Sequence, residues 1–319
     1  MGLRPRNLVF KTRGAQESMY PLRDMSFDGA PSSGTTGTLA GYIEPGGFLF
    51  DKTNGVLFIN EGTKDSPYYT PVGFRQRPLF GVHADFGDGV GIALADTAAA
   101  YTVPGSGLRI FGHGKEVSDS GLVVQTATVG GKVGRLTTTA TASRLIALGM
   151  EAGVMKPSTG QLLVIDVEFT NVTAITLRGI WCGFLGTAAD ALDVAATCAA
   201  TTITMVQDDM AGLLMHVGLT AATELFAPHN KADEAASILT TATGVDTGVV
   251  MPAAATYTRL RVEIDANGTM RCFKDKAEIT KIASAWTPAT AGAPVFYIES
   301  TSAAVKNLDV RQFATWSYR

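Results

Sequence analysis

The 319-residue chain is poor in the side chains that build disulfide frameworks and metal sites. Its three cysteines are an odd number, and no pair has the Cys-x-x-Cys spacing, which argues against a disulfide framework and against a zinc site. We interpret Cys182, Cys198 and Cys272 as buried apolar side chains of a protein from a reducing compartment. We expect no metal ion and no other cofactor.

Histidine and the common catalytic motifs are also scarce. The four histidines stand far apart, without the spacing of a metal-binding motif, at His83, His113, His216 and His229. The hydrolase elbow Gly-x-Ser-x-Gly is absent, because Gly105-Ser106-Gly107 has the wrong spacing. Asp85–Gly91 contains Asp-Phe-Gly, but no other kinase motif accompanies it, so we interpret it as a glycine-rich turn. These absences favour a protein that is not an enzyme.

Charged residues make up only 17% of the chain, and the formal net charge is −3. This balance excludes a general affinity for nucleic acid. The charge is unevenly spread, however. The first 24 residues contain only two acidic side chains, Glu17 and Asp24, but five basic ones: Arg4, Arg6, Lys11, Arg13 and Arg23. We therefore expect the front of the chain to prefer an acidic partner surface.

Long hydrophobic runs are missing. The longest uncharged apolar run, GIWCGFLGTAA at 179–189, is too short to span a bilayer. The opening MGLRPRNLVFKTRG lacks the apolar run of a signal peptide, and Arg6 stands where a myristoylation site needs Ser or Thr. We predict a soluble protein without a membrane partner.

Short β runs, separated by Gly, Pro, Asn or Asp, take the place of amphipathic helices and predict an all-β sandwich. In Arg259–Lys274, apolar and charged residues alternate, which indicates one buried and one solvated face, and Asn267-Gly268 supplies a hairpin turn. We predict a second hairpin from Leu162–Phe169 and Ile175–Gly186, and closing strands at 293–300 and 307–316. The Ala-rich segments 187–200 and 231–240 are expected to be short helices or loops, and Trp181 and Trp286 core residues.

Carboxylates on the predicted strands need separate scrutiny, because sandwich-fold glycosidases use two of them. Asp166 and Glu168 share one strand face, as do Glu263 and Asp265, and Glu151 lies nearby. We interpret them as residues of a solvated outer face. Calcium could be bound by Asp85 with Asp88, Asp208 with Asp209, or Asp265 with Asn267, although none of these pairs fits an EF-hand loop.

The stretch FLFDKTNGVLFINEGTKDSPYYTPVG, residues 48–73, predicts a small hairpin with its turn at Asn54-Gly55. A hairpin this short is only marginally stable alone, so it needs either the main domain or copies from neighbouring chains to cover its apolar side. We divide the chain into an extended arm and linker (1–40), this hairpin element (41–80) and a β-sandwich domain (81–319).

The string DKTNGVLFINEGTKDSPYYTPVG resembles a segment that recurs in virion proteins of tailed bacteriophages. The matching residues are Asn54, Gly55, Asn60, Gly62, Thr63, Tyr69, Pro71 and Gly73. Residues 259–300 are similar to the hairpin and closing strands of a jelly-roll or concanavalin-like sandwich. The segments 85–160 and 187–255 resemble nothing that we can name.

The resemblance implies a capsid decoration or cement protein, a homotrimer that binds the shell of the major capsid protein on the virion surface after synthesis in the host cytoplasm. It involves neither membrane nor nucleic acid. On this hypothesis, residues 1–40 become ordered only on the partner, and the contact residues are Arg4, Arg6, Phe10, Lys11, Arg13, Tyr20, Asn54, Gly55, Tyr68, Tyr69, Trp316 and Tyr318.

Three alternatives stay open at this point. The terminal FATWSYR has the composition of an interface hot spot, but it is equally a final strand docked in the core. The same sandwich would suit a fibre or receptor-binding protein that recognises host glycans. A glycoside hydrolase is the weakest alternative, because carboxylate and aromatic clusters are sparse.

Overall fold

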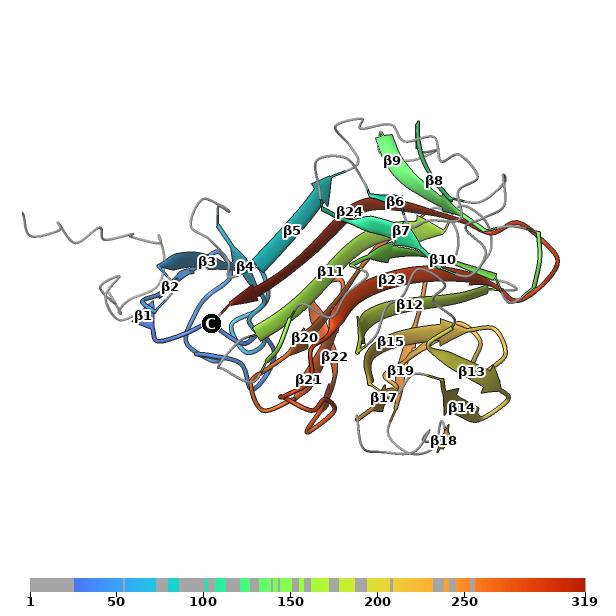
Figure 1. Ribbon diagram of the computed structural model, residues 1–319. Coiled ribbons are helices and arrows are strands. Elements are labelled where there is room, and N and C mark those ends of the chain that lie inside the picture. Colours follow the sequence, from blue (N-terminus) through green and yellow to red (C-terminus); the bar gives the residue numbers. More distant parts are fainter. Residues whose placement is uncertain are drawn as a thin grey trace, which may run out of the picture.

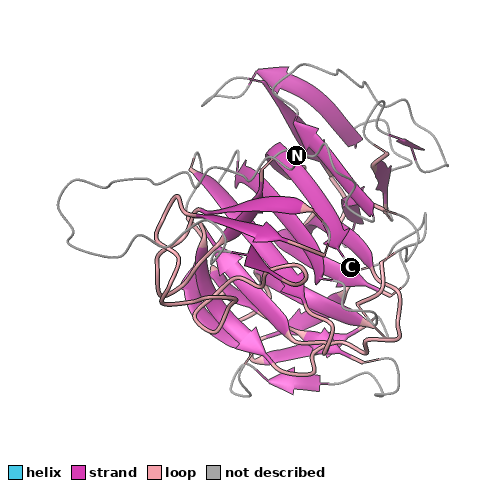
Figure 2. Cartoon of the chain, turned by 90° about the vertical axis from the view of Figure 1, so that its left-hand side faces the viewer, coloured by secondary structure: helices cyan, strands magenta, loops and turns pink. Residues whose placement is uncertain are grey.

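The computed structural model describes most of the chain from residue 26 onward. The described residues are 26–53, 55–72, 80–85, 101–102, 107–112, 121–126, 132–138, 140–142, 144–150, 155–157, 162–171, 178–186, 194–206, 209–231, 238–240, 245–252 and 256–318. Within these ranges the chain forms strands and no helix (Figures 1 and 2), which confirms the all-β fold class. The same residues include no helix long and apolar enough to cross a membrane.

Two large sheets form the body. The nine-stranded sheet runs in the order β19 (Asp246–Val250), β16 (Glu224–Phe226), β15 (Met210–His216), β12 (Arg178–Leu185), β23 (Ala293–Ser300), β10 (Arg144–Gly149), β7 (Arg109–Phe111) and β6 (Tyr101–Thr102), with β17 (His229–Asn230) beside β15. The eight-stranded sheet runs β22 (Ala277–Ile282), β21 (Met270–Lys274), β20 (Tyr257–Ile264), β11 (Leu162–Asn171), β24 (Asn307–Tyr318), β9 (Lys132–Thr137) and β8 (Gly121–Thr126), with β5 (Phe80–Asp85) beside β24.

Two smaller sheets cover the outer faces of this sandwich. A four-stranded sheet, β1 (Ser26–Phe27), β2 (Phe48–Asp51), β3 (Val56–Asn60) and β4 (Tyr69–Pro71), lies against the eight-stranded sheet. A three-stranded sheet, β13 (Ala196–Ala199), β14 (Thr202–Met205) and β18 (Ile238–Thr240), lies against the nine-stranded sheet. Figure 1 shows the four layers in sequence, from β1–β4 at the left to β13, β14 and β18 at the lower right.

The main core lies between the two large sheets. Alternate residues of β11, from Leu163 to Phe169, face alternate residues of β12, such as Ile180 and Phe184, as the two-residue period of a strand requires. The Phe169 and Phe296 rings cross this core with centroids 4.9 Å apart. Because both large sheets are covered on their outer faces too, β12 and β23 are buried along their whole length.

The predicted hairpin of Leu162–Phe169 and Ile175–Gly186 is wrong. Strand β11 pairs with β20 and β24, whereas β12 pairs with β15 and β23, so the two strands belong to different sheets. β12 is apolar on both faces and β11 on its inner face, and such apolar runs do not reveal which neighbour a strand pairs with. The described parts of the Ala-rich segments contain β13 and β18 instead of helices.

The hairpin predicted within Arg259–Lys274 is confirmed as β20 and β21, with Ile264 opposite Met270. Only Gly268 of its loop is left-handed, with φ of +75°, so Asn267 does not share that role. A Cβ on Gly268 would lie 2.0 Å from the Trp286 carbonyl oxygen. The loop therefore requires glycine for its conformation and for its contact with the chain beneath it.

The predicted burial is confirmed for Trp181, Trp286, Cys182 and Cys272, but not for Cys198. Trp181 and Trp286 are fully buried, and the Trp286 indole N–H donates to the Thr290 carbonyl over 3.2 Å. Cys182 and Cys272 are buried, Cys198 is half-buried, and all three are free thiols. Burial raises the pKa of Cys198 to about 12, so this sulfur stays a protonated, unreactive thiol at neutral pH.

Candidate interaction surface

The N-terminal module, residues 26–72, is attached to the sandwich by an apolar contact. The inner face of its hairpin presents Leu49, Val56 and Phe58, together with Tyr69 of β4. These side chains pack on the outer face of the eight-stranded sheet, against Leu162, Val164, Ala314 and Trp316. The cover that the hairpin needs on this side is thus provided by its own chain.

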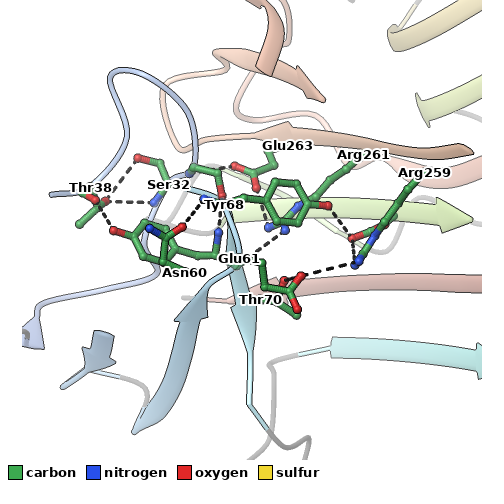
Figure 3. A network of polar contacts seen from close by, with 12 residues as sticks. Ser32, Thr38, Asn60, Glu61, Tyr68, Thr70, Arg259, Arg261 and Glu263 are labelled. Carbon is green, nitrogen blue, oxygen red and sulfur yellow. Dashed lines mark hydrogen bonds and ion pairs between the residues drawn. The ribbon is translucent and has the colours of Figure 1, made fainter. Parts of the chain in front are cut away.

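Asp166 is the centre of a polar network buried in the same junction. Arg259 donates to both of its oxygens, from Nε to Oδ1 and from Nη2 to Oδ2, each over 2.7 Å. The Tyr68 hydroxyl donates to Asp166 Oδ2 over 3.0 Å. Figure 3 shows Tyr68 of the module reaching across to the β20 arginines. One carboxylate therefore joins the module to two strands of the sandwich.

Arg261 makes the second polar connection. Its side chain is only 2% exposed and pairs with Glu263, from Nη2 to Oε1 over 2.5 Å. Nη1 donates to the Tyr69 carbonyl over 2.8 Å. The guanidinium also lies over the Tyr68 ring, 4.3 Å from its centroid, and 5.1 Å from the centroid of Trp316. A buried cation is thereby held by a carboxylate, a carbonyl and two aromatic faces.

The charge state of this network follows from its surroundings. Burial raises the pKa of the Tyr68 phenol and the Asp166 carboxylate raises it further, so the hydroxyl remains a donor. Burial lowers the pKa of Arg259 and of Arg261, but the nearby carboxylates outweigh it, and the pKa of each guanidinium is raised overall. Both arginines are charged, and the junction depends on their ion pairs.

The loop before the hairpin also contacts the sandwich. Ser33 N–H donates to Glu263 Oε2 over 3.3 Å, Thr35 N–H donates to Glu278 Oε2 over 3.1 Å, and Lys281 Nζ donates to Thr36 Oγ1 over 2.7 Å. The hypothesis that residues 1–40 order only on a partner is therefore wrong for residues 26–40, which pack on their own chain. Residues 1–25 lie outside the described part, and the domain boundaries at 40 and 80 stay predictions.

Asn60 and Gly62, two of the residues that carry the phage resemblance, build the turn between β3 and β4. Asn60 Oδ1 accepts from Gly62 N–H and from Tyr68 N–H, each over 2.9 Å, and its Nδ2 donates to the Ile43 carbonyl over 2.8 Å. A Cβ on Gly62 would lie 2.4 Å from the Ser66 carbonyl oxygen. The motif thus specifies a compact loop that directs Tyr68 toward the sandwich (Figure 3), and Tyr69 packs in the apolar junction.

Several predicted partner-contact residues are instead inside the molecule. Tyr68, Tyr69 and Trp316 are buried in the junction, so their surfaces are occupied by their own chain, and the last strand is docked in the fold. Gly55 is half-buried in the hairpin loop, with φ of +68°. The remaining predicted contacts, Arg4, Arg6, Phe10, Lys11, Arg13, Tyr20, Asn54 and the side chain of Tyr318, lie outside the described residues, and their roles stay predictions.

The candidate catalytic carboxylates are engaged in ion pairs. Asp166 and Glu263 are buried under the module, so the expectation of a solvated face is wrong for both, because the module covers that part of the sheet. Asp265 pairs with Arg271 over 3.1 Å and accepts from Asn267 and Thr269 N–H in its own turn. Glu151 lies outside the described residues.

Beyond the module, the outer face of the eight-stranded sheet carries a polar strip. Arg311 lies over the Tyr257 ring, 5.2 Å from its centroid, and pairs with Glu168 over 3.2 Å. Next to them, Arg135 donates to both oxygens of Asp309 over 2.6 and 2.9 Å. The pKa of Tyr257 is raised, first by burial and then by the Asp309 carboxylate. The Arg311–Glu168 and Arg135–Asp309 pairs therefore both act on the surroundings of this tyrosine.

The outer face of the N-terminal module is apolar, which the sequence reasoning missed. Cross-strand pairing places Phe48 opposite Ile59 and Phe50 opposite Leu57, and Val72 N–H donates to the Leu57 carbonyl over 2.7 Å. Phe50 is 42% exposed and Val72 44% exposed, and the other three are half-buried. We call these five residues the apolar outer face. The signal was the unbroken apolar runs of β2 and β3, since a strand with one wet face alternates.

The described histidines do not form a metal site. His216 Nε2 lies 3.6 Å from Glu299 Oε2, while its Nδ1 accepts from Gly218 N–H over 2.9 Å. His229 Nδ1 lies 3.3 Å from the Ala227 carbonyl, and the side chains of His83 and His113 fall outside the described part. Across the described ranges, no three His, Cys, Asp or Glu side chains gather as metal ligands.

Comparison with known proteins gives likenesses of structure alone. No protein-family model and no curated protein matches the sequence. Among solved structures, the carbohydrate recognition domain of Emp47p is 10% identical, with a TM-score of 0.48 over 75% of this chain and 95% of that chain. A protein of unknown function from Shewanella oneidensis MR-1 is 12% identical, with a TM-score of 0.42 over 75% and 86%. A carbohydrate esterase of Shiga toxin-encoding bacteriophage phi24B is 14% identical, with a TM-score of 0.39 over 70% and 99%.

Proposed function

We propose that this protein is a non-enzymatic structural component of a tailed-phage particle, a capsid decoration protein. It binds the shell of the major capsid protein through its N-terminal module, and the sandwich faces outward on the virion. The observation that carries the proposal is the apolar outer face, held on a module whose inner face is fixed to the sandwich. The turn motif built on Asn60 and Gly62 adds the resemblance to virion proteins.

The rigid attachment of the module suits a binding role. Ordering a loop or side chain on binding costs free energy, so a surface that is already fixed binds more tightly for the same contact area. Here Tyr68, Arg259 and Arg261 fix the module from beneath. Glu61 adds ion pairs at the rim, with Arg259 over 3.8 Å and with Lys276 over 3.2 Å. The apolar outer face is therefore presented to a partner in one orientation.

Several linked copies of the protein on a particle would bind more tightly than one copy with the same modest contact. Copies joined in a trimer bind with an effective concentration in roughly the millimolar range after the first contact, which raises avidity by about 10² to 10⁴. The basic residues near the N-terminus would add contacts to an acidic shell surface. Trimer formation and the arm contacts both belong to the proposal.

A particle-binding assay tests the function directly. Particles lacking the protein are mixed with wild-type protein, with Phe50→Asp and with the control Val206→Asp, which places the same charge at an exposed valine next to β14 of the three-stranded sheet. We expect the Phe50 variant to lose about tenfold or more in affinity, because a charge at the centre of an apolar contact must be desolvated. Wild-type occupancy of the Phe50 variant would refute the proposal.

Glycan recognition is the second candidate, and the polar strip beyond the module favours it. Tyr257 offers an aromatic surface, and Glu168 and Arg311 beside it carry polar groups of the kind that bind sugar hydroxyls. A glycan array with Tyr257→Ala tests this candidate, and Tyr42→Ala serves as the control at an exposed tyrosine of the module. Binding that survives in the control and is lost in Tyr257→Ala would establish it as a receptor-binding function.

A further inference from the structure

The apolar outer face groups five apolar side chains on one side of the module. Strands β2 and β3 place apolar side chains on both of their faces, a pattern typical of strands that are covered on both sides. The sandwich covers the inner side, and the described residues leave Phe50 and Val72 exposed on the outer side. Contiguous exposed apolar surface in a free protein marks a site that another segment binds.

We propose that residues 1–25 of the same chain bind the apolar outer face in the free protein and act as its cap. The chain enters the sheet at Ser26, which pairs with Phe50, so the C-terminal end of this segment adjoins the face. Extended, 25 residues span up to about 85 Å, and the strands to be crossed are only about 4.8 Å apart. The segment is therefore long enough by a wide margin.

The composition of the segment matches the face. It contains the apolar groups Leu8-Val9-Phe10 and Met19-Tyr20-Pro21-Leu22, which a merely solvating tail does not need. The charges are complementary as well. Residues 1–25 carry five basic and two acidic side chains, whereas residues 26–72 carry five acidic and two basic ones. Asp28 and Glu44 are mostly exposed and pair with Lys52 and Lys64, each over 3.0 Å, so the two lysines of the module are matched and its acidic excess remains.

Tethering favours this occupant over any other. A segment joined to its own binding surface has an effective concentration of roughly millimolar, far above that of a free partner in solution. The cap lies on the surface proposed above for shell attachment, so particle binding must displace it. The inference that particle binding displaces the cap rests on the proposed function, whereas the inference that the cap exists does not.

Limited trypsin digestion of the full chain tests the cap, because Lys11, Arg13 and Arg23 provide cleavage sites within it. Cleavage before residue 26 is followed by intact mass for the wild type, Phe50→Asp, the milder Phe50→Ser and the control Val206→Asp. We expect both Phe50 variants to be cleaved about tenfold faster than the wild type, because cleavage tracks the released population. The control should match the wild type.

The protein concentration identifies the occupant. Binding within one chain makes the wild-type cleavage rate independent of concentration between about 1 and 100 µM, whereas capture of a second copy's segment slows cleavage as concentration rises. Equal cleavage of the wild type and both Phe50 variants overturns the cap, as does concentration-dependent protection. If the cap fails while Phe50→Asp still loses particle binding, the proposed function stands without it.

Discussion

Arg259 holds Asp166 in a two-pronged ion pair, with two N–H···O bonds of 2.7 Å between a guanidinium on β20 and a carboxylate on β11. The Tyr68 hydroxyl of the N-terminal module donates to the same carboxylate. Strands β20 and β11 are neighbours in the eight-stranded sheet, and Asp166 lies directly opposite Arg261. The pairing of two sandwich strands and the docking of the module therefore depend on one acidic side chain.

Removing this carboxylate should destabilise the protein strongly. Asp166→Ala leaves Arg259 and Tyr68 without their acceptor in a buried site, and breaking a buried pair in this way costs about 3–5 kcal/mol. Urea denaturation measures the free energy of unfolding. Glu168→Ala is the matched control, because Glu168 pairs with the largely exposed Arg311 and should cost about 1 kcal/mol or less. Similar losses in the two variants would contradict the role assigned to Asp166.

The Tyr68 hydroxyl should contribute less than the carboxylate. Tyr68→Phe keeps the ring between Arg261 and Phe273 but removes one hydrogen bond to a charged acceptor, a loss of about 1.5–3 kcal/mol. Thermal unfolding with Tyr42→Phe as the control measures it, since the Tyr42 side chain is 75% exposed. An unchanged melting temperature for Tyr68→Phe would show that the bond does not hold the module.

Substitutions at two glycines with positive φ angles distinguish the cost of backbone strain from the cost of a steric clash. Gly248 has φ of +64°, and a Cβ at this position would meet no other atom within 4 Å, whereas a Cβ on Gly268 meets the Trp286 carbonyl. Gly248→Ala should cost only the conformational strain, roughly 1–2 kcal/mol. Gly268→Ala should cost more, because the backbone around Trp286 must shift as well. Equal free energies of unfolding for the two variants would count against this contact.

Alkaline pH should weaken the fold partly through Cys198. Its pKa is raised by burial to about 12 in the folded protein, so the native state keeps a proton that the unfolded chain, with a thiol pKa of about 8.5, releases. The contribution of the protonated thiol to the free energy of unfolding is fully present below about pH 8.5 and is lost as the pH rises toward about 12. The free energy of unfolding should fall less steeply between about pH 9 and 11 in Cys198→Ala than in the wild type. Parallel pH profiles would contradict the raised pKa of this thiol.

The sequence predicted features whose cause is local. The β20–β21 hairpin follows from alternating Leu260 and Val262 and from the conformational freedom of Gly268, all within a few residues. The wet face assigned to Arg261 and Glu263 was wrong because their cover, around Tyr68, comes from a segment almost two hundred positions earlier in the chain. Alternation in the sequence distinguishes the polar face of a strand from its apolar face. It does not show whether the polar face is exposed to water or buried against another polar segment.

Strand pairing and the interaction surface failed for a related reason. Leu162–Asn171 and Arg178–Leu185 are neighbours in sequence and both have an apolar inner face, and only the tertiary fold assigns them to different sheets. The apolar outer face did have a signal in the runs FLF and VLFI. That signal became interpretable once the structure had shown that the sandwich covers only the inner side of the hairpin.

A cryo-EM map of the protein bound to a phage particle tests the central claim most directly. The account predicts that Phe50, Leu57 and Val72 lie within contact distance of the major capsid protein, with the three-stranded sheet β13–β14–β18 pointing to solvent. A map in which the sandwich touches the shell while the apolar outer face points away would contradict it.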